Sequence, residues 1–283
     1  MSDTIQSIPI SELHPFPENP YKVRDNEELQ AMVDSIRTYG VLTPLIVRPL
    51  DSGGYEIISG HRRLAAAQTA GIATVPAVVR EMDRITAIIA LVDSNLHREH
   101  ILPSEKAYAY KLKLDAVKHQ GVTSRQVVGK LESADIVGLE ANESGRQVQR
   151  HIRLTELNPQ ILQMVDDGKI AFSPAIELSY LTKNEQAALL ETMESEDRTP
   201  SLSQSQRMRR LSAEGLLDMD ATFTIMTEEK PNQKEQIKLK TDTLRRFFPK
   251  GYSPQQMEQT IMKLLADWRE RQLLRQQRDR GAR

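Results

Sequence analysis

Two short segments of the sequence carry side chains whose types and spacing could do chemistry. In the first, Gly60-His61-Arg62-Arg63 follows an apolar run at residues 55–58. Free backbone N–H groups at a helix start, with two guanidinium groups beside them, are typical of a phosphate-binding site. The alternative is a cluster of surface charge near a helix end. Further along, Asn95 and Arg98 fall at the end of another predicted helix and allow the same two interpretations.

The second segment, residues 133–154, has the pattern of a helix-turn-helix. Gly138 lacks a side chain that would hold two crossing helices apart. Asn142 tolerates the left-handed backbone that a sharp turn needs, and Ser144 is a good cap for the helix that follows. Val148 and Ile152 then share the inner face of that helix, because residues four apart lie on one side.

The outer face of the second helix indicates what it binds. Between Ser144 and Leu154 there is no acidic residue. Arginine suits guanine and phosphate and glutamine suits adenine, so this face is typical of a DNA-reading helix. An ordinary helical hairpin with a solvated polar face is the alternative. With Ser144, the predicted DNA-binding residues are Arg146, Gln147, Gln149, Arg150 and Arg153.

Composition sets wider limits. The chain has 283 residues, no cysteine and a formal net charge of -1. Disulfides and thiolate metal sites are therefore excluded, and the histidines have no metal-site spacing. No apolar run approaches the length of a membrane span, and the first residues have no signal-peptide pattern. We expect a cytoplasmic, DNA-associated protein. The net charge does not exclude DNA, since phosphate binding depends on local charge.

The elements that must position these residues follow from periodicity. Strand patterns at residues 4–8, 44–49, 55–58 and 75–80 alternate with helical patterns at Asn26–Tyr39 and His61–Ala70, which predicts an α+β or α/β domain. From Ile85 to about Leu217 the patterns are helical, and Ser104 is a plausible N-cap of the helix that begins near Pro103.

Beyond this helical region the patterns change again. The polar stretch Glu194–Gln206 is a candidate linker. Ala221–Met226 and Gln236–Lys240 have strand patterns, and a long helix follows from Ser253 with an apolar stripe that ends at Trp268. The arginine-rich tail after Trp268 could add non-specific phosphate contacts.

We therefore expect four regions. Residues 1–100 form an α+β domain with the candidate phosphate site, and residues 101–193 an all-α DNA-binding domain with the helix-turn-helix at 133–154. Residues 194–220 are a linker and helix. Residues 221–283 form a small α/β C-terminal domain with the basic tail.

The order of these motifs resembles the ParB/RepB family of partition proteins, of the type found on plasmids or conjugative elements. The resemblance covers about residues 5–182 and lies in LQAMVDSIRTYGVLTPLIVRP, YEIISGHRRLAAAQTAGI, SNLHRE and the helix-turn-helix. It implies that residues 1–100 form a sulfiredoxin-like nucleotide-binding domain that binds CTP and Mg²⁺, and that residues 221–283 form a dimerisation domain. It also implies a homodimeric clamp on double-stranded DNA at a palindromic centromere-like site, and a partner ATPase of the ParA type.

Carried over by position, the resemblance assigns Asn95 to Mg²⁺ and Arg98 to the phosphates. The other residues that it places at the nucleotide are Asn19, Lys22, Gly60, His61, Arg62 and Arg63. Three positions depart from the family pattern: His61 and Ser94 stand where glutamate is common, and Asn19 stands where glutamine is common. Two of these positions support hydrolysis in relatives. We therefore expect CTP binding and leave CTP hydrolysis open.

Two other functions remain possible. A ParB-like transcriptional repressor, or a regulator of the nucleoid-occlusion type, could use the same scaffold. A nuclease or kinase could use the N-terminal fold, but no cluster of carboxylates and no paired nucleophile and base accompanies the arginines.

Overall fold

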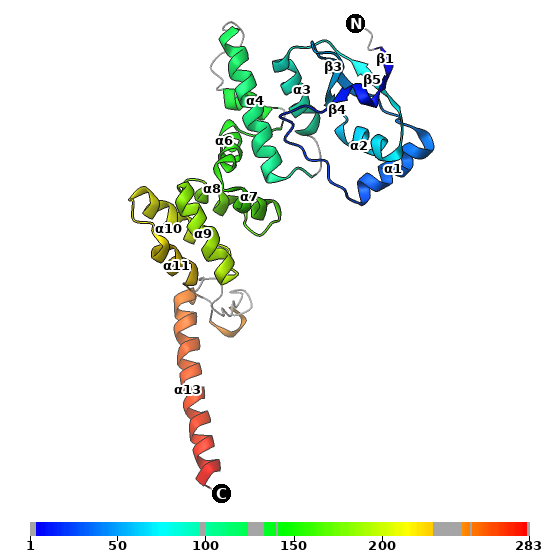
Figure 1. Cartoon of the computed structure of the whole chain (residues 1–283). Coiled ribbons are helices and arrows are strands. Elements are labelled where there is room, and N and C mark those ends of the chain that lie inside the picture. Colours follow the sequence, from blue (N-terminus) through cyan, green and yellow to red (C-terminus); the bar gives the residue numbers. More distant parts are fainter. Residues whose placement is uncertain are drawn as a thin grey trace. The chain divides into compact units, whose positions relative to one another are not determined.

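The computed structural model describes residues 4–96, 100–123, 133–139, 141–228, 245–249 and 251–281. Its contacts divide the chain into two units, residues 1–228 and 229–283. Figure 1 shows the elements of both units. None of the helices in the described ranges combines the length and the apolar character that crossing a bilayer requires.

A five-stranded mixed sheet forms the centre of the N-terminal region. Its strands are β1 (Ile5–Pro9), β2 (Leu13–His14), β3 (Leu45–Pro49), β4 (Tyr55–Ser59) and β5 (Thr74–Val79). The order across the sheet is β1-β5-β3-β4-β2. β5 pairs antiparallel with β1 and parallel with β3, and β4 pairs antiparallel with β3 and parallel with β2. The four predicted strands are confirmed, whereas β2 is too short for a pattern to predict.

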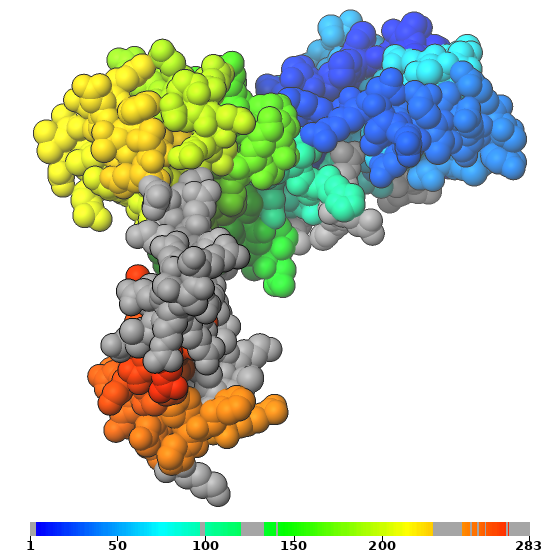
Figure 2. Space-filling view, turned by 90° about the horizontal axis from the view of Figure 1, so that it is seen from below, coloured from blue at the N-terminus to red at the C-terminus, as the bar shows by residue number. Residues whose placement is uncertain are grey.

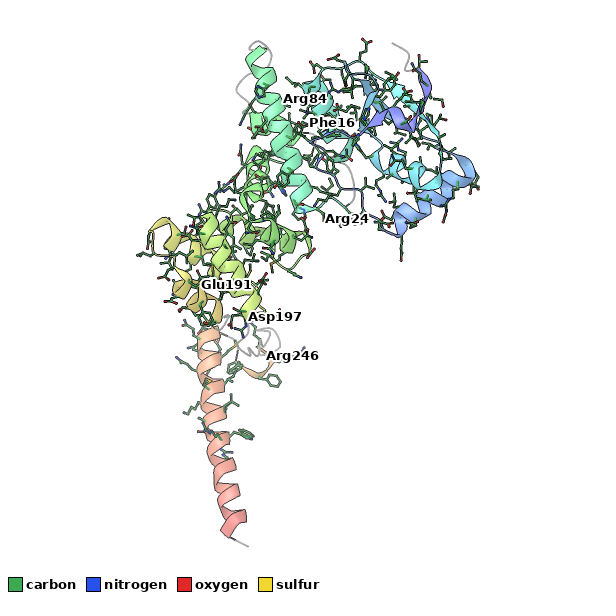
Figure 3. The ribbon with its side chains drawn as sticks, viewed as in Figure 1. Phe16, Arg24, Arg84, Glu191, Asp197 and Arg246 are labelled. Carbon is green, nitrogen blue, oxygen red and sulfur yellow. The ribbon has the colours of Figure 1, made fainter. Side chains whose placement is uncertain are left out.

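Helices cover both faces of this sheet. Successive side chains of a strand point to opposite faces, so Ile57 and Ile58 belong to different cores. Ile57 packs with α1 (Glu27–Tyr39) and α2 (His61–Ala70), and Ile58 packs with α3 (Arg84–Leu96) and Phe16. The Phe16 ring also lies 5.3 Å from the guanidinium carbon of Arg84, which pairs with Glu18 (Figure 3). The α+β class predicted for this region is confirmed.

The remainder of the first unit is helical. The helices are α4 (Pro103–Thr123), α5 (Ser133–Leu139), α6 (Gly145–Arg153), α7 (Pro159–Asp166), α8 (Phe172–Leu178), α9 (Lys183–Glu196), α10 (Leu202–Ala213) and α11 (Met219–Thr227). One core contains Tyr110 and Leu114 of α4 with Val137 and Val148. Another joins α7 to α11, whose surface is continuous from green to yellow in Figure 2.

Three sequence expectations need correction. Ala221–Met226 is helical, in α11, because Asp218 caps the helix and Thr222, Ile225 and Met226 are buried at helical spacing against α9. Ser104 lies inside α4 and is not its N-cap. The expected linker 194–206 contains the end of α9 and the start of α10, whose Met193 and Met208 share one core. The expected strand 236–240 lies outside the described residues.

In the second unit, the described residues form one short 3₁₀ turn, Arg245–Phe247, and α13 (Pro254–Gly281). Ser253 begins α13 as a reciprocal cap with Gln256. On the predicted stripe Met257 is buried, whereas Leu264, Leu265 and Trp268 are exposed.

Candidate functional site

The helical segment at residues 133–154 has the predicted geometry. α5 ends at Leu139 and α6 begins at Gly145, and Asn142 between them has a φ of 53°. A Cβ on Gly138 would lie 2.2 Å from the carbonyl oxygen of Glu143 and 3.2 Å from Val148. The turn can therefore pass over α5 only because residue 138 is glycine.

Two side chains satisfy the start of α6. Ser144 accepts the N–H of Gln147 at 3.2 Å, as the sequence predicted. Asp135 of α5 accepts the N–H of Gly145 at 2.9 Å, and a Cβ at residue 145 would lie 2.3 Å from that carboxylate oxygen. Asp135 was not predicted from the sequence, although an acid ten residues before a glycine at a helix start was a visible signal. Two helix-start N–H groups are thus paired, which fixes how α6 leaves the turn.

A charged cluster behind the turn connects it to α4. Glu143 forms an ion pair with Lys106 and accepts the hydroxyl of Tyr110 at 3.1 Å. Burial, and then the Glu143 carboxylate, raise the pKa of Tyr110. Burial, and then the positive charge of Lys106, lower the pKa of His151 to about 4, so its ring is neutral at pH 7. The sequence analysis predicted none of these four groups.

The predicted DNA-reading residues differ in their exposure and in the contacts that they make within the protein. Arg146 and Gln149 are exposed, and no hydrogen bond or ion pair is recorded for either within the described part of the chain. Gln147 and Arg150 bond to each other at 3.3 Å. Arg153 is half-buried and donates to the carbonyl oxygen of Ser179 at 2.8 Å. The most accessible groups are therefore Arg146 and Gln149.

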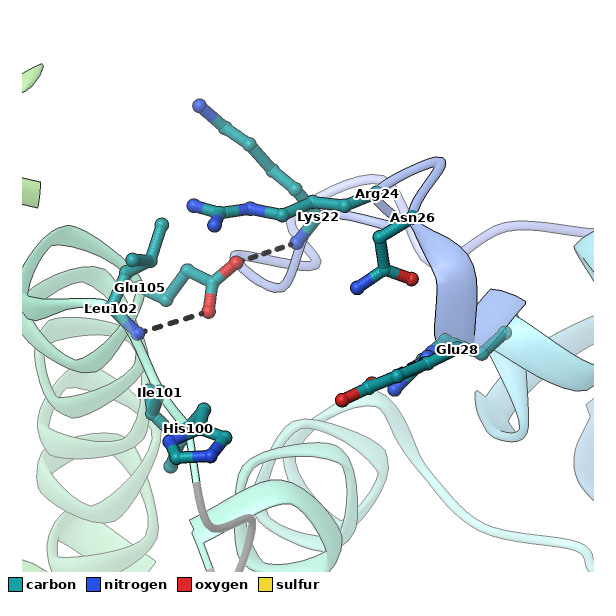
Figure 4. A pocket seen from close by; sticks show the side chains of 9 residues that line it. Lys22, Arg24, Asn26, Glu28, His100, Ile101, Leu102 and Glu105 are labelled. Atoms are coloured by element: carbon teal, nitrogen blue, oxygen red, sulfur yellow. Dashed lines mark hydrogen bonds and ion pairs between the residues drawn. The ribbon is translucent and has the colours of Figure 1, made fainter. Parts of the chain in front are cut away.

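A second candidate site is a polar cavity of about 620 Å³ in the first unit. Figure 4 shows a carboxylate of Glu105 bridging two backbone N–H groups at its edge, those of Lys22 at 3.1 Å and Leu102 at 3.3 Å. Three cations line the cavity, and two carboxylates partly balance them. The lining residues are Lys22, Arg24, Asn26, Glu28, Arg62, His100, Ile101, Leu102 and Glu105.

The two adjacent arginines at the start of α2 have different environments. Arg62 lines the cavity and pairs with Glu28 at 3.0 Å, and its side chain is 30% exposed. Arg63 instead donates to the carbonyl oxygens of Thr43 and Pro44 at 2.7 and 2.6 Å, and burial lowers the pKa of its guanidinium. Arg62 therefore faces the cavity beside an exposed carboxylate, whereas Arg63 stabilises the loop before β3.

Gly60 and His61 lie at the start of α2, but neither is among the residues that line the cavity. Gly60 precedes the helix with a φ of 108°, and a Cβ there would lie 2.8 Å from Leu45 and 3.2 Å from the Arg63 guanidinium. Glycine is therefore required at this helix start for conformation and for space.

The structure does not bring all the predicted nucleotide residues together. Asn19 lines a different depression, beside Tyr108 and Lys111. Asn95 is buried and donates to the carbonyl oxygen of Leu91 at 2.7 Å, and it is not among the residues that line the cavity. Arg98 lies outside the described residues. Within the described ranges no group of three or more metal-ligating His, Asp or Glu side chains occurs.

The donor set of the cavity therefore fits an anion better than a metal ion. Lys22 and Arg24, which the fold brings opposite Arg62, supply positive charge from two segments of the chain. The sequence signal for Arg24 was its place two residues after Lys22.

The Oδ1 atom of Asn95 is the one predicted magnesium ligand. Mg²⁺ commonly takes one or two protein oxygens with phosphates and waters.

Residues 1–96 match the family model described as the ParB N-terminal domain. Among curated proteins, the chain is similar to stage 0 sporulation protein J of Bacillus subtilis, with 36% identity over 170 residues, which are 60% of this chain and 55% of that protein. It is also similar to a nucleoid occlusion protein of Geobacillus sp., with 31% identity over 58% of this chain and 60% of that protein. The chain thus matches little more than half the length of these relatives.

Two solved structures of C-terminally truncated ParB from Caulobacter crescentus also align with the chain. One is complexed to the centromeric parS site, with 24% identity, a TM-score of 0.45, and coverage of 72% of this chain and 98% of that one. The other is complexed with CTP-gamma-S, with 26% identity, a TM-score of 0.32, and coverage of 67% and 98%.

Proposed function

We propose that the protein is a site-specific DNA-binding partition protein, starting from the match of residues 1–96 to the family model described as the ParB N-terminal domain. It reads a palindromic, centromere-like duplex through α6 and acts as a homodimer that clamps DNA. A partner ATPase of the ParA type moves the complex, and the cargo is a plasmid or mobile element.

One observation supports this proposal above the others: the outer face of α6 is cationic, polar and accessible. Gln149 lies three residues after Arg146 and Arg150 lies four residues after it, so both share a side of the helix with Arg146. The turn at Gly138 and the caps Ser144 and Asp135 hold this face in one orientation. Such a helix start presents side chains to base edges in the major groove.

For the N-terminal region we propose CTP as the ligand. Lys22, Arg24 and Arg62 would contact the phosphates in the polar cavity, because cations on two separate segments can surround a triphosphate. The backbone N–H groups at the start of α2, after Gly60, would add an anion-binding helix end. Bound Mg²⁺ would neutralise phosphate charge. Asn95 as its ligand is a proposal that rests on the family resemblance.

Site-specific DNA binding is tested by selecting bound duplexes from a random pool and measuring their affinities. We expect an enriched palindrome. Gln149→Ala should lower the affinity for it by about 1–3 kcal/mol and relax one position of the motif. Gln206→Ala, in α10, is the control and should change neither. A pool with no enriched sequence would refute site-specific binding, and an equal loss on all duplexes would make Gln149 a backbone contact.

A transcriptional or nucleoid-occlusion regulator is the second candidate, because one relative is a nucleoid occlusion protein. A partition protein and a regulator differ in the effect that the bound palindrome has on the DNA that carries it. A plasmid that carries the enriched palindrome should be retained through cell division only when the protein and its ATPase are present. If the palindrome instead changes expression of adjacent genes without affecting retention, the regulator is favoured.

A further inference from the structure

Two arginines of α6 lie over aromatic rings that flank α8. The guanidinium carbon of Arg150 is 5.2 Å from the ring centre of Phe172, the first residue of α8. That of Arg153 is 4.2 Å from the ring centre of Tyr180, two residues after the end of α8. Aromatic faces attract guanidinium groups and orient their planes. Phe172 and Tyr180 therefore position two of the three arginines of the reading helix.

Arg153 is held more firmly than the other outer residues of α6. Besides the Tyr180 ring, its Nε donates to the hydroxyl of Ser179 at 3.3 Å and its Nη2 to the carbonyl oxygen of Ser179 at 2.8 Å. A guanidinium has five N–H donors, so some remain available for another acceptor. These contacts keep Arg153 beside α8, at the end of α6 that is farther from the base-reading helix start.

A third residue from a distant segment completes this group. The guanidinium carbon of Arg209, on α10, lies 3.6 Å from the same Tyr180 ring centre. Its Nη1 also donates to Glu177 at 2.8 Å. The Tyr180 residue is 44% exposed and the Arg209 side chain 43% exposed, so solvent reaches the group. We name Arg153, Tyr180 and Arg209 the Tyr180 platform.

The platform extends the outer face of α6. Arg153 lies four residues after Gln149 and seven after Arg146, so all three share one side of the helix. Two guanidinium groups lie on one exposed ring, and among the described residues Glu177 is the one acid bonded to them, which leaves an excess of positive charge there. Like charges held close together favour an anion beside them. In a duplex read by α6, the anion at this distance from the bases is the sugar-phosphate backbone.

We propose that the Tyr180 platform binds a backbone phosphate of the DNA and adds affinity that does not depend on sequence. The proposal rests on the proposed function of α6 as a DNA reader. Arg153 and Arg209 contact the phosphate, while Tyr180 and Ser179 are positioning residues. A purely structural stack would change stability when it is removed but would leave the salt dependence of DNA binding unaltered.

The test measures binding of the full chain to a duplex of mixed sequence at a series of salt concentrations. Each phosphate contact contributes about 0.9 to the slope of log K against log salt concentration. Arg209→Gln should reduce the slope by about one and weaken binding to every duplex by the same factor. The matched control is Arg207→Gln on the same helix, whose guanidinium pairs with the exposed Glu228 at 2.6 Å, and it should leave the slope unchanged.

Further variants distinguish loss of the proposed phosphate contact from loss of folding stability. Arg209→Lys keeps the charge and should keep the slope. The double variant Glu177→Gln with Arg209→Gln leaves no unpaired carboxylate and should give the same reduced slope as Arg209→Gln alone. Tyr180→Phe keeps the ring and should behave as the unaltered chain, whereas Tyr180→Leu should lose affinity.

An unchanged slope in Arg209→Gln, both alone and combined with Glu177→Gln, would overturn the proposal. So would a loss confined to one DNA sequence, because that marks a base contact. If the unaltered chain binds no duplex at all, the proposed function fails instead, and the two failures are therefore distinguishable.

Discussion

The backbone N–H of Lys22 donates to Oε1 of Glu105 at 3.1 Å, across 83 positions of the chain. The residues on either side of Glu105 make contacts of their own. Ser104 donates its N–H and hydroxyl to Asp166, and Lys106 pairs with Glu143 in the turn before α6. The first turn of α4 thus contacts the edge of the cavity, the end of α7 and the turn before the reading helix.

Removing the Glu105 carboxylate should weaken this junction. Glu105 is nearly buried, and its loss leaves the N–H groups of Lys22 and Leu102 without their acceptor. We expect Glu105→Ala to lower the free energy of unfolding by about 1–3 kcal/mol. Urea unfolding followed by circular dichroism measures this. Glu191→Ala, an exposed change on α9 (Figure 3), is the control and should stay within about 0.5 kcal/mol. Equal effects of the two variants would contradict the role of Glu105.

The two arginines of α2 should separate ligand binding from stability. Arg62 lines the cavity, so Arg62→Ala should reduce CTP affinity by tenfold or more, the effect of losing about 1.4 kcal/mol. Arg63 holds two carbonyl oxygens, so Arg63→Ala should instead lower the free energy of unfolding by about 1–3 kcal/mol. Calorimetric titration with CTP and Mg²⁺, beside urea unfolding, measures both. If Arg62→Ala binds CTP normally, the cavity is not the phosphate site.

Gly138 should not tolerate a methyl group. The added Cβ would lie 2.2 Å from the Glu143 carbonyl oxygen, a backbone atom that cannot turn away as a side chain could. Gly138→Ala should destabilise the protein by about 1–3 kcal/mol, the usual cost of forcing extra atoms into a packed site, and should abolish selection of a specific duplex. Leu139→Ala, at the exposed next residue of α5, is the control for thermal unfolding. A stable Gly138→Ala variant that still selects its DNA site would show that the turn can accept a Cβ at this position, which contradicts the prediction.

His151 should make stability depend on pH. Its pKa is about 4 in the folded protein, against 6.5 for an ordinary histidine, so the unfolded state binds more protons between these values. Its contribution is fully present above pH 6.5 and is lost as the pH falls toward 4. Between pH 7 and pH 4.5 the loss is on the order of 2 kcal/mol. His151→Phe should flatten the pH dependence of the unfolding free energy over this window relative to the unaltered chain. Parallel curves for His151→Phe and the unaltered chain would contradict the pKa assignment.

Local residue patterns determined a large part of the molecule. The strands at 45–49, 55–59 and 74–79, the helix at 61–70 and the turn at Asn142 depend on alternation, glycine stops and backbone preference, which act over a few neighbouring residues. The Ser144 cap is equally local. At Ala221–Met226 a local rule failed, because burial against α9 outweighed the β-propensity of the residues.

Only the tertiary structure decided which side chains meet across the chain. The sequence predicts equal roles for Arg62 and Arg63, but the fold turns one toward the cavity and the other onto the loop before β3. It likewise brings Arg209 to Tyr180 and Glu105 to Lys22. Such pairs are separated by 29 to 83 positions and depend on how helices pack, whereas periodicity reports only the face on which a residue lies.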